Sequence, residues 1–161
     1  MSDAGHPVSP APPELDFFAT LSVQVAAAHE VGQTPAGNRR IIPILGGQVQ
    51  GRGWSARVLP GGADFQAIVT PTLARLDARY LLETEAGELI YVCNRAVRAA
   101  APEVTARLIR GEPVDPAQVY FRCVPTFETA APSLAWINER VFVGTGVRRP
   151  DRVEISCFNV L

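Results

Sequence analysis

Residues 73–98 read LARLDARYLLETEAGELIYVCNRAVR, and this stretch decides the fold class. Apolar residues occupy positions 76, 78, 80 and 82, whereas positions 77, 79 and 83 carry charge. A period of two is typical of a strand that buries one face, and it predicts a strand at residues 73–83. Residues 85–87 then predict a hairpin turn, and residues 88–98 a returning strand rich in β-forming side chains.

Similar patterns extend outward from this hairpin in both directions. Further strands are predicted at residues 15–25, 39–50, 54–59, 65–69, 119–128, 140–147 and 152–160. Gly46 and Gly47 predict a bulge or bend inside the second of these, and residues 32–38 a loop. One helix is expected at 102–110, between Pro102 and Gly111, and a short helical turn at 132–138.

Strands at this spacing, without helices between them, favour an antiparallel sheet, and closure of that sheet removes its exposed edges. The sequence therefore predicts a mostly β protein: a single antiparallel β-barrel of about eight to nine strands with one short helix. The 161 residues suit one domain. We expect residues 1–13, with four prolines, to form a disordered leader and residues 14–161 to form the barrel.

Composition excludes several classes of protein. The net charge of −1 gives no field that would attract nucleic acid or an acidic membrane. No apolar run is long enough to span a membrane and the N-terminus lacks a signal pattern, so we expect a cytoplasmic protein. The three cysteines show no CxxC spacing, which argues against a disulfide framework and a zinc site. GxGxxG and P-loop motifs are absent, and no cofactor or metal is expected.

All fifteen basic residues are arginine. Genomic base composition explains such a bias, and so would a need for bidentate anion contacts, which lysine makes poorly. Both explanations can hold together, because only inward-facing arginines require the second.

The strand at residues 120–128 has an unusually polar face. Tyr120, Arg122, Thr126 and Glu128 alternate with the apolar set Phe121, Cys123 and Phe127. This polar face is either solvated, with Arg122 and Glu128 paired, or an inner polar wall of the barrel.

Other polar candidates lie near turns and strand ends. Asp64 follows Gly61 and Gly62 and could move a proton, although a plain turn aspartate fits as well. Arg79 shares a strand face with Asp77. Trp136 could stack a planar ligand near the barrel mouth or plug the core, and Asn138 lies two residues further on.

Several blocks together carry a resemblance to a known family. They are residues 39–44 with Gly46, Gly47 and Gly51, residues 59–66, residues 76–80, residues 120–122 with 127–129, and Trp136 with Asn138. From residue 15 to residue 161 the chain resembles the small β-barrel proteins of the domain of unknown function 3237 family. Two details depart from the expected pattern: Ala96 stands where a glycine is expected, and the turn at residues 85–87 lacks an aspartate before Gly87.

The resemblance implies a barrel of about eight or more antiparallel strands that is often a homodimer, and it supplies no reaction. It also implies that one set of polar residues belongs to the family pattern: Arg39, Asp64, Arg79, Arg122, Glu128, Trp136 and Asn138.

Three functions stay open on these residues. The first is a cofactor-independent acid–base enzyme of the isomerase, cyclase or lyase type acting on a small oxygenated or carbonyl compound. Asp64 and Glu128 would be its catalytic residues, and its substrate-binding residues would be Arg39, Arg79, Arg122, Trp136 and Asn138. The second is a non-catalytic carrier or sensor for a small acid or aromatic compound. The third is an interaction module with a filled barrel, which an open interior would exclude.

Overall fold

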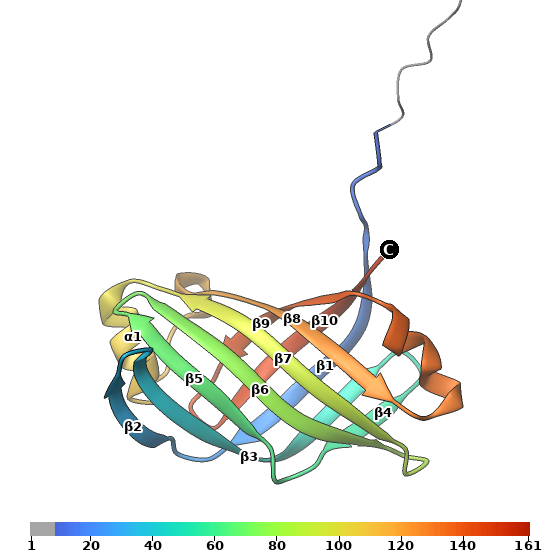
Figure 1. The fold of residues 1–161 in the computed structure, drawn as a ribbon, viewed down its shortest axis with the longest axis horizontal. Helices are drawn as coiled ribbons and strands as arrows, with labels where there is room; N and C mark the ends of the chain where they lie inside the picture. The colour runs from blue at the N-terminus through green and yellow to red at the C-terminus, as the bar shows by residue number, and fades with distance from the viewer. Residues whose placement is uncertain (1–8) are drawn as a thin grey trace, which may run out of the picture.

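The computed structural model describes residues 9–161, and ten strands lie within them (Figure 1). The strands are β1 (Leu15–Val25), β2 (His29–Thr34), β3 (Gly37–Gly51), β4 (Ser55–Val58), β5 (Ala63–Thr70), β6 (Leu73–Thr84), β7 (Leu89–Ala99), β8 (Tyr120–Thr129), β9 (Phe142–Arg148) and β10 (Arg152–Val160). Helix α1 (Pro102–Ile109) and the 3₁₀ helices η1 (Pro116–Gln118) and η2 (Pro132–Glu139) complete the described elements.

The sheet closes on itself. From β1 the pairing runs through β10, β9, β8, β7 and β6, and β1 also pairs with β3. Strands β4 and β5 both join β6 to β3, each along a different part of these long strands. Every pairing is antiparallel, so the predicted antiparallel barrel is confirmed.

Strand β2 extends into the loop predicted at residues 32–38, and β3 begins at Gly37 within the same range. Among the described strands it pairs with the first part of β3 alone, and the register shifts between Glu30 and Gly32. The glycines that suggested a loop therefore belong to an irregularity within the strand and to the tight β2–β3 turn. This hairpin extends the barrel wall at one end.

The predicted irregularity at Gly46 and Gly47 is confirmed. The register between β1 and β3 shifts at this point, between Gln24 and Val25. Gly47 has a φ of +144°, and a Cβ there would lie 3.1 Å from the Cα of Val23 and in collision with the carbonyl oxygen of Ser22. The close approach of β1 and β3 that closes the barrel therefore requires a glycine at this position.

Gly47→Ala is expected to lower the free energy of unfolding by about 3 kcal/mol, because it adds a collision to an unfavourable φ. Gly53→Ala is the matched control, since Gly53 has a φ of +73° but nothing within 4 Å of the position that a methyl group would take. It should cost about 1 kcal/mol. Urea unfolding of both variants measures the difference, and equal losses would show that backbone contact at Gly47 is unimportant.

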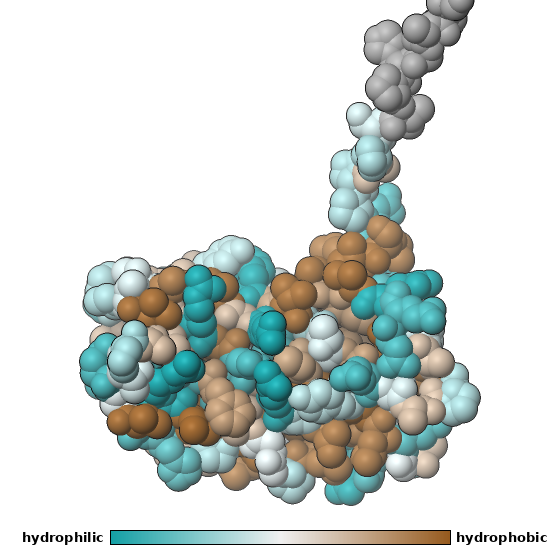
Figure 2. Space-filling model, in the orientation of Figure 1, coloured by the Kyte–Doolittle hydropathy of each residue, from teal (hydrophilic) through white to brown (hydrophobic). Residues whose placement is uncertain are grey.

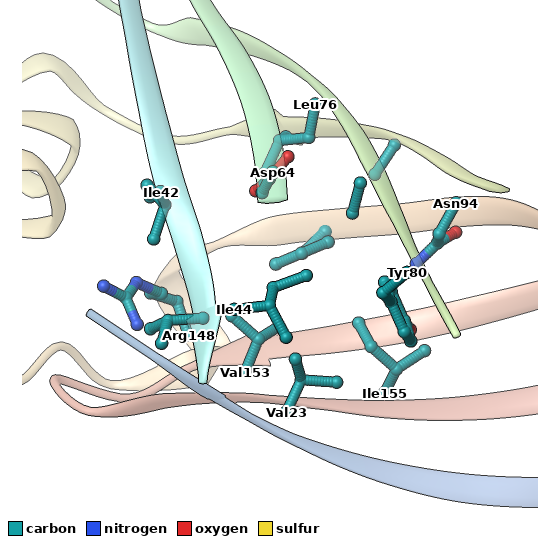
Figure 3. Close-up of a pocket in the computed structure, with 14 residues that line it drawn as sticks. Val23, Ile42, Ile44, Asp64, Leu76, Tyr80, Asn94, Arg148, Val153 and Ile155 are labelled. Atoms are coloured by element: carbon teal, nitrogen blue, oxygen red, sulfur yellow. The ribbon is translucent and has the colours of Figure 1, made fainter. Parts of the chain in front are cut away.

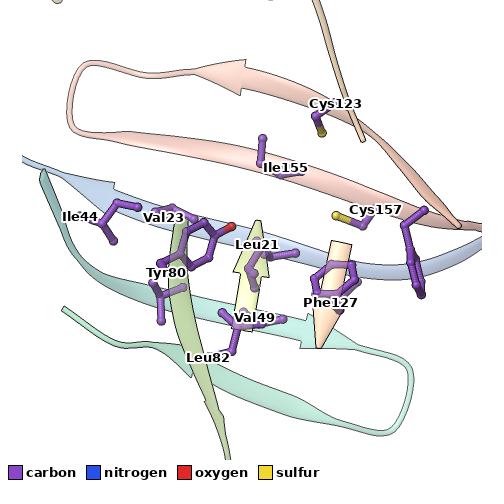
Figure 4. Packing of buried hydrophobic residues seen from close by; sticks show 14 of the residues in the cluster. Leu21, Val23, Ile44, Val49, Tyr80, Leu82, Cys123, Phe127, Ile155 and Cys157 are labelled. Carbon is purple, nitrogen blue, oxygen red and sulfur yellow. The ribbon is translucent and has the colours of Figure 1, made fainter. Parts of the chain in front are cut away.

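Layers of apolar side chains fill the barrel interior, beginning at the end where η2 lies. Phe18, Phe127 and Phe142 form an aromatic layer in which the ring of Phe142 lies 4.8 Å from that of Phe18 and 4.9 Å from that of Phe127. An aliphatic layer that includes Leu21 and Leu82 follows (Figure 4). Helix α1 lies at the opposite end of the barrel from η2 (Figure 1), and its residues Val104 and Leu108 form a separate small core with Val114.

The outer face of β5–β8 mixes hydrophilic and hydrophobic residues (Figure 2). Cys123 and Cys157 are buried and Cys93 is partly buried, all as free thiols. Burial raises the pKa of Cys123 to about 11, which is typical of an unreactive thiol. Within residues 9–161, no helix has the length and apolar composition required to cross a membrane.

The predicted leader falls only partly within the structure. Residues 9–13 are exposed and form no regular secondary structure, and residues 1–8 lie outside the described part of the chain.

Candidate functional site

Polar side chains replace apolar ones on the inner wall of the barrel near the α1 end. Asp64 and Gln66 point inward from β5, and Asn94 and Arg98 point inward from β7, all with at most 8% of their surface exposed. Burial of so many polar groups is costly unless they are hydrogen-bonded. Yet Asp64 Oδ1, Gln66 Oε1 and Asn94 Oδ1 find no hydrogen-bond partner among the described residues.

A cavity of about 40 Å³ opens beside two of these residues, Asp64 and Asn94. Its wall is mostly aliphatic, and its polar members are Asp64, Tyr80, Asn94 and Arg148 (Figure 3). Space exists because Ala78, which pairs with Asp64 on one side and Asn94 on the other, contributes only a methyl group. We call this space the barrel cavity. It has room for about three water molecules.

Asp64 is the acidic group of the barrel cavity. Its Oδ2 accepts a hydrogen bond of 2.7 Å from Gln66 Nε2, and none of the described arginines lies within ion-pair distance of it. Burial raises the pKa of Asp64, and the hydrogen bond from Gln66, the charges of Arg98 and Arg148 and the backbone N–H of Asp77 only partly offset that effect. A carboxyl with a raised pKa and a free oxygen toward a cavity can give and take a proton.

Tyr80 and Asn94 lie together on one side of the barrel cavity, and Arg148 lies on the other (Figure 3). Tyr80 is 5% exposed, and burial raises its pKa well above the ordinary value. Its hydroxyl is therefore neutral and available as a hydrogen-bond donor. Asn94 adds an amide at the same side. Both can bind an oxygen atom of a ligand.

Arg148 stands at the β9–β10 hairpin, half-buried. Its Nη1 donates to the carbonyl oxygens of Arg149, at 2.6 Å, and Arg152, at 3.3 Å. The guanidinium thus has one end fixed to the hairpin while its side chain lines the cavity. Within residues 9–161 no three His, Cys, Asp or Glu side chains gather closely enough to hold a metal ion.

The structure separates the sequence-predicted residues by the barrel wall. Asp64 faces the cavity, whereas Arg39, Arg79 and Arg122 are exposed on the outer surface. Arg79 forms an ion pair of 3.1 Å with Asp77, its neighbour on β6. Arg122 donates to the Phe121 carbonyl and lies over the ring of Tyr120 at 5.0 Å. The polar face of β8 is therefore the outer face and not an inner wall.

Glu128 and Asn138 meet each other, but on the outside of the barrel. They border a shallow hollow that also involves Tyr91. Asn138 accepts from the backbone N–H of Thr129 and donates to the Thr129 carbonyl, at 2.9 and 3.0 Å. This double contact fixes η2 against β8. Glu128 and Asp64 lie on opposite sides of the wall and cannot act on the same bond.

Trp136 closes the aromatic end of the barrel. Its ring lies 5.6 Å from that of Phe18 and 6.1 Å from that of Phe142, with 42% of the residue exposed. Trp136 therefore packs against the aromatic layer at the η2 end and does not line the barrel cavity beside Asp64.

Four of the polar residues at this end of the barrel were not predicted as site residues, although the sequence carries a signal for some: Arg40, Gln66, Arg98 and Arg148. Along β7 the buried positions are 90, 92, 94 and 98, so Asn94 and Arg98 share the parity of Ile90 and Val92. Polar residues at core parity mark an inner polar wall. For Arg148, at the end of β9, no pattern in the sequence shows whether the side chain points into the barrel.

Comparisons with known proteins agree with this architecture. The sequence profile of the family described as protein of unknown function DUF3237 matches residues 13–160. The chain belongs to this family. Among relatives of this DUF3237 chain is a UPF0311 protein of Rhodopseudomonas palustris, 44% identical over 148 residues that cover 92% of this chain and 97% of that protein. Another, from Clostridium acetobutylicum, is 36% identical over 150 residues, covering 91% and 95%.

Solved structures share the DUF3237 barrel. The R. palustris protein, of unknown function, superposes with a TM-score of 0.89 at 41% identity, covering 94% of this chain and all (100%) of that one. A structure described as an enzyme from Penicillium herquei gives a TM-score of 0.71 at 19% identity, covering 96% and 98%. The latter likeness shows a common fold and nothing more.

Proposed function

We propose that the protein is a cofactor-independent acid–base enzyme that binds a small oxygenated or carbonyl compound in the barrel cavity. One observation carries the proposal: Asp64, a buried carboxyl, presents an unpartnered oxygen on the wall of an interior cavity. A perturbed carboxyl in a concave, mostly apolar site is typical of catalytic positions.

The chemistry follows from the groups on the cavity wall. The Asp64 carboxylate takes a proton from carbon next to a carbonyl group, or from a hydroxyl, and returns it at another atom of the substrate. Negative charge then develops on the substrate oxygen. Hydrogen bonds from the Tyr80 hydroxyl or the Asn94 amide, both at the wall, stabilise that charge in a site with little water. Isomerisation, cyclisation and elimination all use a group that transfers a proton and a group that stabilises negative charge on oxygen.

The small volume of the barrel cavity favours a second candidate. The space has room for about three water molecules, so a ligand enters with one functional group unless side chains move. A carrier or sensor that holds an acid group needs no more than this. Asp64→Asn separates the two candidates: turnover should fall by about 10²–10⁴-fold in an enzyme, whereas a carrier keeps its ligand and its function.

A thermal-shift screen against small carboxylates, lactones, phenols and quinones tests the proposed site. A compound at 100 times its Kd should stabilise the protein by about 2.7 kcal/mol. Ala78→Leu fills the barrel cavity and should abolish the shift, at a cost in stability of about 1–3 kcal/mol. Arg57→Ala, on the exposed part of β4, is the control for a change outside the cavity.

Arg122→Ala decides between the cavity and the outer surface. If compounds bind in the cavity, their shifts survive Arg122→Ala and disappear in Ala78→Leu. The reverse pattern would place the binding site on the outer face of β8 and overturn the proposal.

A further inference from the structure

Three arginines converge on the α1 end of the barrel: Arg40 from β3, Arg98 from β7 and Arg148 from β9. Arg40 is 6% exposed and Arg98 is 4% exposed. We call these three residues the arginine layer. Burial lowers the pKa of Arg98 to about 10, with Arg148 and Arg40 adding to that effect and Asp64 opposing it. Arg98 thus remains charged at neutral pH.

The positive charge of the arginine layer is only partly balanced. Arg40 donates from Nη1 to the Ile109 carbonyl at the end of α1 and lies 3.5 Å from the exposed carboxylate of Glu30. Arg148 contacts two carbonyl oxygens of its own hairpin. Within residues 9–161, the Arg98 guanidinium has neither an ion pair nor a hydrogen bond to a side chain or carbonyl.

Asp64 is a buried carboxyl that interacts with the charges of Arg98 and Arg148, but it stands beyond ion-pair distance from both. Buried cations are costly unless an anion lies close to them. Apart from the exposed Glu30 beside Arg40, the described residues place no carboxylate within ion-pair distance of the arginine layer, so its positive charge is only partly balanced. Gln66, directly opposite Arg40 across the β3–β5 pair, also leaves its Oε1 without a partner among them.

We propose that the barrel cavity receives the carboxylate group of a small organic acid, bound on the side of Arg148, the member of the arginine layer that lines the cavity, and that its binding is accompanied by uptake of a proton on Asp64. This rests on the proposed function and names its ligand class. A carboxylate has three non-hydrogen atoms and matches a cavity that holds about three water molecules. The remainder of the acid extends past Arg148 at the hairpin.

Proton uptake follows from the surroundings of Asp64. The charged, titratable and polar groups that face its region are Gln66 on β5, Arg40 on β3, Tyr80 on β6, Asn94 and Arg98 on β7, Cys123 on β8, Arg148 on β9 and Cys157 on β10. None of these adds a negative charge at neutral pH. An incoming carboxylate would do so, and two carboxylates in one buried site share a proton.

Acetate and benzoate are the probes, with acetamide and benzamide as neutral analogues of the same shape. NMR titrations of the full chain between pH 6 and pH 8, in cationic or zwitterionic buffer at low salt, give each Kd. The Kd for acetate should rise with pH, by up to tenfold per unit, because a proton must be taken up. In Asp64→Asn the Kd should be independent of pH and lower than that of the wild type at pH 8.

Arg98→Met should weaken acetate binding at least tenfold in both the wild-type and Asp64→Asn backgrounds. This variant is expected to fold, since apolar side chains of similar shape commonly replace buried charges without loss. Arg57→Met, at an exposed ion pair with Glu83, is the matched control and should leave the Kd unchanged.

The outcomes separate the two proposals. Binding of benzamide that Ala78→Leu abolishes, without binding of benzoate or acetate, would overturn the carboxylate inference and leave the cavity as the binding site. Acetate binding that does not depend on pH would overturn proton uptake on Asp64. Equal binding to wild type and Ala78→Leu would place the ligand outside the cavity and overturn both.

Discussion

Replacing Phe142 by alanine is expected to lower the free energy of unfolding by about 3–5 kcal/mol. Phe142 is 1% exposed and contacts the rings of Phe18, Phe127 and Trp136 at the η2 end of the barrel. Truncation to alanine leaves a void at the centre of that aromatic layer, because the closed sheet around it has little freedom to collapse. Urea unfolding monitored by circular dichroism measures the loss.

Val141→Ala is the control for this prediction. Val141 is the preceding residue and is 62% exposed. Its truncation should change the free energy of unfolding by about 0.5 kcal/mol or less. Comparable losses in the two variants would mean that the aromatic layer does not stabilise the barrel.

Asp64→Asn is expected to be more stable than the wild type at neutral pH, and this advantage should disappear in acid. The pKa of Asp64 is raised in the folded protein by burial, so folding favours the protonated carboxyl. The stability that comes from the protonated form is fully present below the pKa of the unfolded chain. It is lost as the pH rises through the folded pKa, at about 1.4 kcal/mol for each unit by which the pKa is raised. Asparagine imitates the protonated form at every pH.

Asp77→Asn provides a control with the opposite sign. Asp77 lies on the outer face of β6, and its hydrogen bond from Arg79 lowers its pKa. Its contribution to stability is therefore present above the unfolded pKa and is lost as the pH falls through the folded pKa. Free energies of unfolding between pH 3 and pH 8 should thus diverge from the wild type in opposite directions for the two variants. The same direction for both would contradict the assigned environment of Asp64.

The fold could be predicted from the sequence because period-two patterns set most of the strands. Strands β6 and β7, joined through a short turn, show that pattern most clearly, and each begins and ends within one residue of the predicted range. Strand β2 was missed because Gly32 lies within it and Pro35, Gly37 and Asn38 follow directly, which together favour a loop. That strand buries none of its residues, so no hydrophobic pattern marks it.

The site was only partly predictable, because a shift of one residue in register moves a side chain through the barrel wall. Arg39 and Arg40 show this: they are adjacent and precede Ile41 and Ile42, a run without alternation that does not say which arginine points inward. The structure buries Arg40 and exposes Arg39. For Arg122 the alternation was present, since Phe121 and Cys123 occupy the core face. Whether Asp64 and these arginines share one site could be decided only from the tertiary structure.

Open space inside the barrel separates the three functions that the sequence left open. An interaction module is expected to have a filled barrel, and the barrel cavity beside Asp64 argues against that function. Acid–base catalysis and simple binding of an acid both use the same cavity, and they differ in whether Asp64 exchanges its proton with the ligand.

The most direct test is the titration of Asp64 itself. The carboxyl carbon of Asp64 can be followed by ¹³C NMR as a function of pH and assigned by its loss in Asp64→Asn. We predict a midpoint above that of an ordinary aspartate in the free protein, and a further increase when acetate is present. A midpoint at or below the ordinary value, unchanged by acetate, would contradict the claim that Asp64 is the proton-exchanging group of an acid-binding cavity.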